Sequence, residues 1–276
     1  MKRPDPLAEV VKHYESVPEA QRLLEGASQL EWLRTQEVLT RFLPPPPAVI
    51  LDVGGGPGAY ACWLARRGYE AHLIDLVPLH VQQALQASKG QPEHPLASAS
   101  VGDARRLERA DASVDALLFF GPLYHLTERA DRVSALHEAR RVLRQGGVVV
   151  AAAISRFASL LDGLARGYLD DPDFARMVER DLKDGQHRNP TNNPAYFTTA
   201  FFHHPEELAA EMREAGLRHE STMAVEGPGW LLQDFQAHWN DAARRERLLK
   251  AIRAVEGEPS LLGASAHLLA VARKTP

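Results

Sequence analysis

The chain has 276 residues, of which 45% are hydrophobic and 25% charged, and its formal net charge at pH 7 is −4. This composition is typical of a globular protein, and the length allows one large α/β domain or two small ones. The weak negative charge argues against nucleic acid or an anionic membrane as the partner. The single cysteine, Cys62, excludes an intramolecular disulfide, and no apolar stretch resembles a signal peptide or a membrane span. We therefore expect a soluble protein with a cytoplasmic location.

Residues 1–45 are predicted to form an N-terminal helical cap. Apolar residues such as Leu7, Val10 and Tyr14 recur at helical spacing, and the run Pro44–Pro47 then stops any helix. Tyr14 either packs over a bound ligand or is an aromatic residue on the apolar face of a helix. The sequence leaves both interpretations open.

A strand, a glycine-rich turn and a helix follow one another between residues 49 and 67. The apolar run Val49–Val53 contains one acid, Asp52, and four glycines follow within five positions: Gly54, Gly55, Gly56 and Gly58. Glycine adopts positive φ angles and lets a ligand approach the main chain, while the first N–H groups of the helix are free to bind it. This stretch predicts a site for a nucleotide-like ligand.

An acid also ends the second predicted strand, residues 70–75. Asp75 lies 21 residues after Gly54, which is the spacing at which an acid accepts hydrogen bonds from ribose hydroxyls. An aspartate at the end of a strand is also a common turn former, but the glycine turn before it favours the ribose role.

The remaining pattern alternates helices and strands. A helix at 79–87, a polar third strand ending near Asp103, a strand at 115–120, a helix at 128–144 and an apolar strand at 148–154 follow in order. Gly146 and Gly147 are predicted to cap the long helix. The alternation predicts a three-layer α/β sandwich with a parallel sheet, whose special residues gather at one edge.

Residues 155–200 differ in composition from the rest of the chain, because they combine scattered large apolar residues with polar stretches interrupted by proline. We interpret them as a lid or substrate-selecting insertion, with a disordered linker as the alternative. His203 and His204 lack companions at metal-ligand spacing, so no metal site is predicted. A strand at 217–225, one last helix over 235–252 and a strand at 267–272 complete the chain.

Five motifs in order resemble the class I S-adenosylmethionine-dependent methyltransferases of the small-molecule type. They are Asp52-x-Gly54-x-Gly56-x-Gly58, Asp75, Gly102-Asp103-Ala104, Phe120-Gly121-Pro122 and Val142-Leu-Arg-Gln-Gly-Gly147. The resemblance covers residues 45–155 well. It implies a Rossmann-like, mostly parallel, seven-stranded sheet with an antiparallel last strand, in a methyltransferase domain over residues 46–276.

The resemblance also implies roles for single residues toward S-adenosyl-L-methionine. Gly54, Gly55, Gly56 and Gly58 would face its methionine part, and Asp52 would order that turn. Asp75, with Leu76 beside it, would hold the ribose hydroxyls. Asp103 would accept from the adenine amino group with Ala104 alongside, and Phe120 would lie near the methionine amino group. Apart from the resemblance, Tyr14 remains a candidate cofactor contact if the N-terminal segment folds back over the pocket.

Methyl transfer from a sulfonium needs an aligned nucleophile and the exclusion of water, and a base helps when the nucleophile carries a proton. His125, in the loop after the fourth strand and next to Tyr124, is the predicted base. The alternative is that His125 only packs this loop. The expected acceptor is a small, partly apolar molecule bound by a monomer or homodimer.

Two other functions remain open at the level of sequence. Gly54-x-Gly56-x-x-Ala59 and Asp75 also fit an NAD(P)-dependent oxidoreductase, although that fingerprint requires neither Asp52 nor Asp103. A cofactor-binding regulator without catalysis is the second alternative. Asn193-Pro194-Ala195-Tyr196 resembles a motif of enzymes that methylate DNA bases, but it follows the wrong strand and is interpreted as a coincidence.

Overall fold

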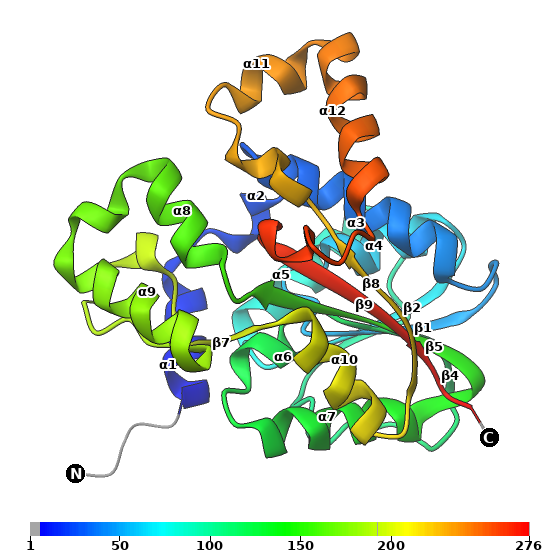
Figure 1. Ribbon diagram of the computed structural model, residues 1–276. Helices are drawn as coiled ribbons and strands as arrows, with labels where there is room; N and C mark the ends of the chain where they lie inside the picture. Colours follow the sequence, from blue (N-terminus) through cyan, green and yellow to red (C-terminus); the bar gives the residue numbers. More distant parts are fainter. Residues whose placement is uncertain (1–5, 192, 276) are drawn as a thin grey trace.

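The centre of the protein is a twisted sheet of apolar strands, seen in a computed structural model that describes residues 6–191 and 193–275 (Figure 1). Its nine strands are β1 (Val49–Val53), β2 (Glu70–Asp75), β3 (Ser98–Val101), β4 (Val114–Phe119), β5 (Leu143–Ser155), β6 (Gln186–His187), β7 (Ala200–His203), β8 (Arg218–Ala224) and β9 (His267–Arg273). Most of their residues are hydrophobic, as expected for strands covered on both faces.

Seven of these strands form the main sheet in the order β3-β2-β1-β4-β5-β9-β8. The pairs from β3 to β5 are parallel, whereas β9 runs antiparallel to both β5 and β8. This confirms the predicted sheet with its antiparallel last strand. Two short strands were not predicted: β7 pairs with the end of β5 at Ile154 and Ser155, and β6 pairs with β7.

Helices cover both faces of the sheet. They are α1 (Pro6–Ser16), α2 (Glu19–Arg22), α3 (Ser28–Phe42), α4 (Ala59–Arg66), α5 (Pro78–Lys89), α6 (Pro122–His125), α7 (Arg129–Val142), α8 (Ala158–Arg166), α9 (Pro172–Asp184), α10 (Pro205–Glu214), α11 (Phe235–Asn240) and α12 (Ala242–Val255). Four 3₁₀ turns are added: η1 (Tyr168–Asp170), η2 (Pro194–Tyr196), η3 (Gly227–Leu231) and η4 (Leu262–Ala264).

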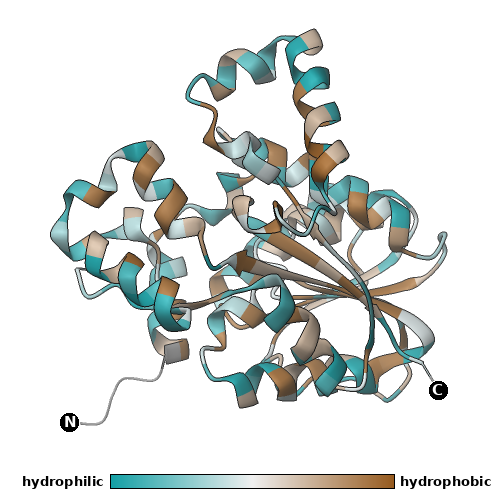
Figure 2. Cartoon of the chain, in the orientation of Figure 1, coloured by the Kyte–Doolittle hydropathy of each residue, from teal (hydrophilic) through white to brown (hydrophobic). Residues whose placement is uncertain are grey.

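Alternating strand residues divide the core into two halves. Leu117 and Phe119 pack toward α7 and α10, whereas Ala116 and Leu118 pack toward α3, α4 and α5. Successive side chains of a strand point to opposite faces, so each strand contributes to both cores. The hydropathy colouring shows this apolar centre between more polar outer surfaces (Figure 2). The predicted three-layer sandwich is therefore confirmed.

The predicted cap of the long helix by Gly146 and Gly147 is wrong. Helix α7 ends at Val142, and β5 already begins at Leu143. The ammonium group of Lys274 donates to the carbonyls of Arg141 (3.3 Å) and Leu143 (2.7 Å). A lysine from the far end of the chain thus satisfies the carbonyls at the end of this helix, and a side chain can do this as well as a glycine turn.

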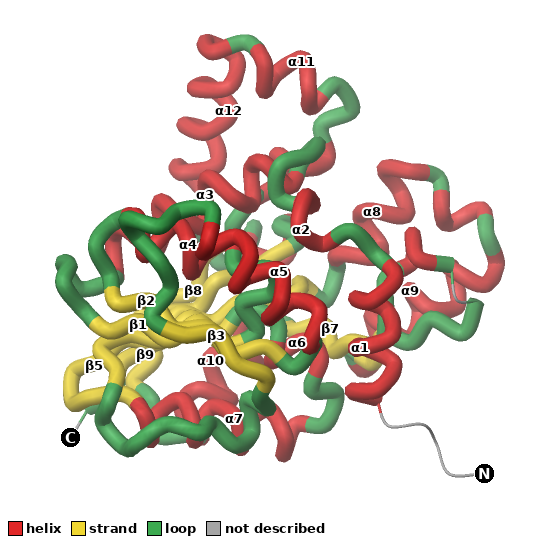
Figure 3. The backbone as a smooth tube through the Cα atoms, turned by 180° about the vertical axis from the view of Figure 1, so that it is seen from behind, coloured by secondary structure: helices red, strands yellow, loops and turns green. Residues whose placement is uncertain are grey.

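The single last helix predicted over 235–252 is also wrong, because α11 and α12 are separate. Asp241 lies between them and accepts a hydrogen bond from the Arg244 backbone N–H (2.8 Å), which starts a new helix. Phe235 and Ile252 pack against Leu30 of α3. The pair stands apart from the sheet in both the front and back views (Figures 1 and 3).

The predicted lid segment, residues 155–200, is folded rather than linker-like. Helices α8 and α9 enclose a small core of Phe174, Met177, Val178 and Tyr196, and lie beside α1 (Figures 1 and 3). The Thr199 hydroxyl donates to Glu9 of α1 (2.5 Å). The N-terminal helices and this segment therefore contact one another beyond the end of β5.

In the part of the chain that the structure describes, no helix combines the length and the apolar character needed to cross a membrane.

A buried ion pair joins α7 to α10 below the sheet. The Arg132 guanidinium donates from Nε and Nη2 to Glu211 (2.7–3.1 Å) and from Nη1 to the carbonyls of Leu126 and Thr127. Both side chains are 2% exposed. Although burial alone would raise the pKa of Glu211, His203 and Arg132 lower it to about 2. Glu211 is therefore charged and depends on its partners.

Replacing Arg132 with methionine should lower the free energy of unfolding by roughly 3–5 kcal/mol, because Glu211 would keep a buried charge without its main partner. The matched control is Arg218→Met, since Arg218 is 58% exposed and pairs with Glu220 on the surface. Surface pairs contribute at most about 1 kcal/mol. Urea denaturation of both variants measures the difference, and equal losses would contradict this account of the buried pair.

Candidate active site

A cavity of about 440 Å³ lies at the carboxyl ends of the parallel strands. Every predicted cofactor residue except Asp52 lines it: Tyr14, Gly54, Gly55, Gly56, Gly58, Asp75, Leu76, Asp103, Ala104 and Phe120. Tyr124 and His125 line the same cavity. The ends of parallel strands meet at one edge of the sheet, so residues far apart in the chain converge there.

The glycine turn after β1 has a backbone that other residues would not tolerate. Gly54 has φ +76°, and a Cβ atom at this position would lie 2.4 Å from the Phe120 carbonyl oxygen. Gly58 has φ +89° and is the N-cap of α4. The turn therefore runs close to the end of β4 and presents main chain, rather than side chains, to the cavity.

Asp75 fixes the other side of this turn. Its Oδ2 accepts a hydrogen bond from the Gly56 backbone N–H (2.8 Å), and its Oδ1 accepts from the Val77 N–H (2.8 Å). The Nδ1 atom of His80 lies 3.2 Å from the same Oδ1. The carboxylate is 7% exposed and still lines the cavity. Asp75 thus ties the end of β2 to the glycine turn.

Asp52 lies beneath the turn, outside the cavity lining. Its side chain is buried, and within residues 6–191 and 193–275 neither carboxylate oxygen makes a hydrogen bond of normal geometry, the Ala61 backbone N–H being only a weak donor to it. Burial and the nearby charge of Asp75 raise the pKa of Asp52 to about 7, which the Ala61 N–H opposes in part. A group in this state favours a nearby cation, because a positive charge would lower the cost of ionising it.

Asp103, at the third strand end, is paired with Arg105. The Arg105 guanidinium donates to both carboxylate oxygens (2.6–3.1 Å), and the Arg105 backbone N–H donates to Oδ1 (2.8 Å). Burial opposes the shift, but these bonds to Arg105 lower the pKa of Asp103. Asp103 is therefore an ionised carboxylate at the cavity wall. Both of its oxygens already accept hydrogen bonds from Arg105.

Tyr14, His125 and Thr199 form a hydrogen-bonded chain. The Tyr14 hydroxyl lies 3.0 Å from Nε2 of His125, and Nδ1 of the same ring lies 3.3 Å from the Thr199 carbonyl. A carbonyl only accepts, so Nδ1 carries the proton and Nε2 accepts from Tyr14. Burial lowers the pKa of His125 to about 4, although the Thr199 carbonyl opposes this. The imidazole is therefore neutral, and its basic nitrogen is occupied.

Sequence reasoning missed an aromatic group at the end of the cavity nearest α3. The ring of Tyr60 lies 4.9 Å from that of Trp32 and 5.2 Å from that of Phe120, and all three residues line the cavity. Aromatic faces attract cations. Only the tertiary contact between α3, α4 and the end of β4 brings these rings together, so local spacing contained no signal for the group.

A second cavity, of about 490 Å³, adjoins the first. Its walls come from the N-terminal helices and from the 155–200 segment, and include Val17, Ile154, Phe174, Tyr196, Phe202 and Trp230. Five residues line both cavities: Tyr14, Glu19, Arg22, Tyr124 and His267. The site therefore has two neighbouring compartments with a common boundary.

Comparison with known proteins shows what this chain is similar to. Residues 51–151 match the family model described as "Methyltransferase domain". A ubiquinone/menaquinone biosynthesis C-methyltransferase, UbiE of Caulobacter vibrioides, is 31% identical over 169 residues, which is 58% of this chain and 62% of the relative. The malonyl-[acyl-carrier protein] O-methyltransferase of Methylococcus capsulatus is 36% identical over 115 residues, covering 39% and 38% of the two chains. Residues 51–151 are thus similar to a methyltransferase domain, and these two relatives are methyltransferases.

The match to these relatives is partial, since the chain spans 62% of the length of the UbiE protein and 38% of that of the O-methyltransferase. The fold agrees over a larger part: an S-adenosylmethionine-dependent methyltransferase of Methanosarcina mazei superposes with a TM-score of 0.59 at 17% identity, over 86% of this chain and 97% of that one. The matching family favours S-adenosylmethionine, rather than NAD(P), as the cofactor. The oxidoreductase alternative has no support in these comparisons.

The residues at the first cavity fit S-adenosylmethionine, the cofactor that the matching family favours. The glycine turn leaves the main chain open where a Cβ atom would fill the space, Asp52 is a buried carboxylate without a hydrogen bond of normal geometry, and the Trp32–Tyr60–Phe120 rings suit a sulfonium cation. The adenine and ribose acceptors expected at the strand ends, Asp103 and Asp75, line the same cavity.

Two alanine substitutions in the turn should have different effects on stability. Gly54 and Gly56 both have positive φ, which costs an L-residue roughly 1–2 kcal/mol, but only Gly54 has atoms close to its missing Cβ. Gly54→Ala should therefore destabilise the protein by about 2 kcal/mol more than Gly56→Ala. Denaturant unfolding without cofactor measures this. Equal losses would mean that the turn moves away from Phe120 freely.

Proposed function

We propose that this protein transfers the methyl group of S-adenosylmethionine to a small, partly apolar acceptor held in the second cavity. The observation that carries the proposal is the common boundary between a cavity with the cofactor motifs and a largely apolar one. In-line displacement requires the acceptor to approach the methyl carbon from the side opposite the sulfur, and adjoining compartments allow this approach.

The cofactor roles follow the strand ends. Asp75 would accept from the ribose hydroxyls with Leu76 beside it, and Asp103 would accept from the adenine amino group next to Ala104. Glycines 54–58 would hold the methionine part, with Phe120 near its amino group. Asp103 would share its oxygens with Arg105, so adenine binding would loosen that pair.

Bound S-adenosylmethionine supplies an electrophilic methyl carbon on a sulfonium leaving group. The protein's contribution is to position the acceptor against this methyl carbon and to exclude water from the site. Tyr14 of α1, whose hydroxyl is held by His125, would close the cofactor compartment. Contacts between the N-terminal helices and the 155–200 segment, such as Thr199 to Glu9, support the proposed cap and lid. The cytoplasmic location and the monomer or homodimer stay predictions.

The relatives leave the acceptor open. One is named for a C-methylation in ubiquinone/menaquinone biosynthesis and another for O-methylation of malonyl-[acyl-carrier protein], so the printed acceptors differ in chemistry. Apolar and aromatic side chains make up most of the wall of the second cavity, which supports an acceptor with an apolar body. The weak overall negative charge supports a small molecule over nucleic acid.

Titration calorimetry tests the cofactor part of this proposal. S-adenosylmethionine should bind with micromolar affinity, the Asp75→Asn variant should bind it at least about tenfold more weakly, and NAD should not bind. Asp234→Asn is the control, because Asp234 lies at the start of α11 and lines neither cavity. Binding of NAD alone would overturn the proposal.

The role of His125 can be tested through its partner. We propose that His125 positions Tyr14, because its Nε2 is occupied and its pKa of about 4 makes it a weak base. Tyr14→Phe and His125→Ala should then each raise the KM for S-adenosylmethionine, and the double variant should be no worse than the worse single one. If His125 is instead the base first predicted, His125→Ala alone should lower kcat, and Tyr14→Phe should spare it.

A further inference from the structure

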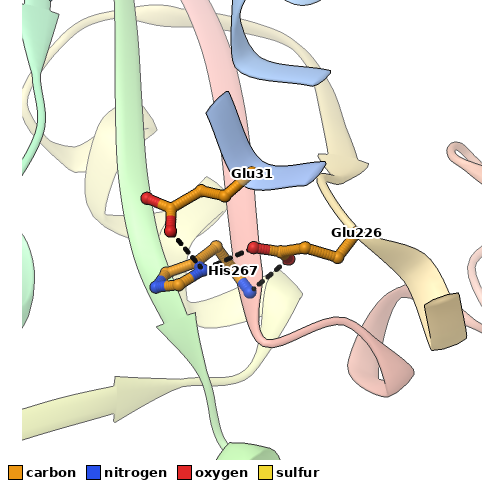
Figure 4. A group of neighbouring side chains, drawn as sticks. All are labelled: Glu31, Glu226 and His267. Carbon is orange, nitrogen blue, oxygen red and sulfur yellow. Dashed lines mark hydrogen bonds and ion pairs between the residues drawn. The ribbon is translucent and has the colours of Figure 1, made fainter. Parts of the chain in front are cut away.

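His267 lies at the boundary between the two cavities, between two glutamates (Figure 4). It is the first residue of β9, whereas Glu31 comes from α3 and Glu226 follows β8. Its Nδ1 lies 2.7 Å from Glu226 Oε1 and 3.9 Å from Glu31 Oε2. Glu226 Oε2 also accepts from the His267 backbone N–H (3.0 Å) and the Ser265 hydroxyl (2.8 Å). Glu226 thus fixes both the backbone and the ring of His267.

This environment makes His267 a cation at neutral pH. Burial alone would lower its pKa, but the charges of Glu31 and Glu226 outweigh burial and the opposing charge of Arg22, and raise the pKa to about 9. Both ring nitrogens then carry protons. One proton is donated toward Glu226, and the other, on Nε2, is available.

Nε2 has no hydrogen-bond partner within residues 6–191 and 193–275, and Figure 4 shows it on the side of the ring away from both carboxylates. Nε2 is not one of the fully buried polar atoms without a partner, so it is in contact with open space. The His267 side chain as a whole is 26% exposed. Because His267 lines both cavities, this N–H donor is open to a ligand at their boundary.

The carboxylates of this cluster, in contrast, are already engaged. Arg22 donates from Nη1 and Nη2 to Glu31 (2.5 and 3.1 Å) and from Nε to Glu19 (2.7 Å). Glu31, Glu226 and His267 could in principle surround a metal ion, since one ligand atom from each lies within 4.8 Å of the others. An ion there would have to displace Arg22 from Glu31 and the proton from Nδ1. The network therefore favours an imidazolium donor over a metal site.

We propose that His267 binds the acceptor molecule, by donating from Nε2 to an anionic oxygen of a carboxylate or phenolate whose apolar body lies in the second cavity. The inference deepens the proposed function and rests on it. Glu226 and Glu31 act as positioning residues, because they hold the imidazolium in place and keep it charged. Apolar walls around the charge strengthen the ion pair by excluding water.

The other charged groups at the second cavity leave His267 as the main donor to an anion. The negative charges of Glu19 and Asp162 are compensated by ion pairs with Arg22 and Arg166 (2.8 Å for the second pair). Burial lowers the pKa of His13, so that ring is neutral at neutral pH. Arg22 has three of its donors committed to Glu19 and Glu31.

The test uses model ligands on the full chain saturated with S-adenosylhomocysteine, the demethylated cofactor. Benzoate and 4-nitrophenolate carry the two anionic oxygens, and benzyl alcohol and benzylamine are the neutral and cationic controls. At pH 8 at least one of the two anions should bind, and which of them binds distinguishes the carboxylate from the phenolate. Affinity should fall as pH rises through 9, where His267 loses its charge.

Two variants distinguish a direct contact of His267 with the anion from a general effect of substitution on binding. His267→Phe keeps a ring without a donor and should weaken binding of the anion at least tenfold, whereas His267→Gln should restore part of the affinity. His219→Phe is the matched control, since His219 lies on β8, bonds to Thr222 and lines neither cavity. Equal affinity of His267→Phe and the wild type would overturn the proposal.

The His267→Phe variant leaves two glutamates without this partner and could unfold. A measurement on the wild-type protein therefore tests the same proposal independently. NMR titration of the His267 ring should give a higher pKa with benzoate bound, since an anion stabilises the cation. No change at saturating benzoate, preferred binding of benzylamine, or displacement of the ring proton by added Mg²⁺ or Zn²⁺ would each overturn the proposal. Failure of S-adenosylhomocysteine to bind would instead refute the proposed function itself.

Discussion

The hydrogen bond from the Gly56 N–H to Asp75 is the contact on which the site depends. It joins the glycine turn after β1 to the end of β2, the strand beside it in the sheet. The turn can approach Asp75 in this way because its positive φ angles and missing side chains leave the main chain accessible. One carboxylate therefore shapes the turn and, in the proposed complex, also meets the ribose.

Charge is distributed unevenly along the edge of the sheet. Beneath the glycine turn, burial and the charge of Asp75 raise the pKa of Asp52 to about 7, so a cation nearby would favour its ionised form. At the boundary with the second cavity, His267 is a cation held by two glutamates. In the proposed reaction these opposite preferences would draw the cofactor and an anionic acceptor to neighbouring places, so that the methyl carbon and the nucleophile meet between them.

The errors of prediction have a common physical origin. Gly146 and Gly147 have the local pattern of a helix cap, but Lys274 from the end of the chain serves the helix carbonyls instead. The last helix divides at Asp241, since its side chain accepts from Arg244 and starts α12. In both cases a side chain distant in sequence, or a local cap, competed with the expected partner. The base role of His125 stays a prediction, with the Tyr14 hydroxyl, 111 residues away, at its Nε2.

The sequence by itself determined the fold and brought most of the predicted cofactor residues to one cavity. Strand, turn and helix signals are local, and in a parallel α/β sheet each strand end reaches the same edge, so Asp52, Asp75 and Asp103 could be placed before any contact was known. Only the tertiary structure decided what surrounds the proposed acceptor cavity. Glu31, Glu226 and His267 lie on three separate elements with no shared pattern. Their chemistry arises from contact and burial, which folding alone creates.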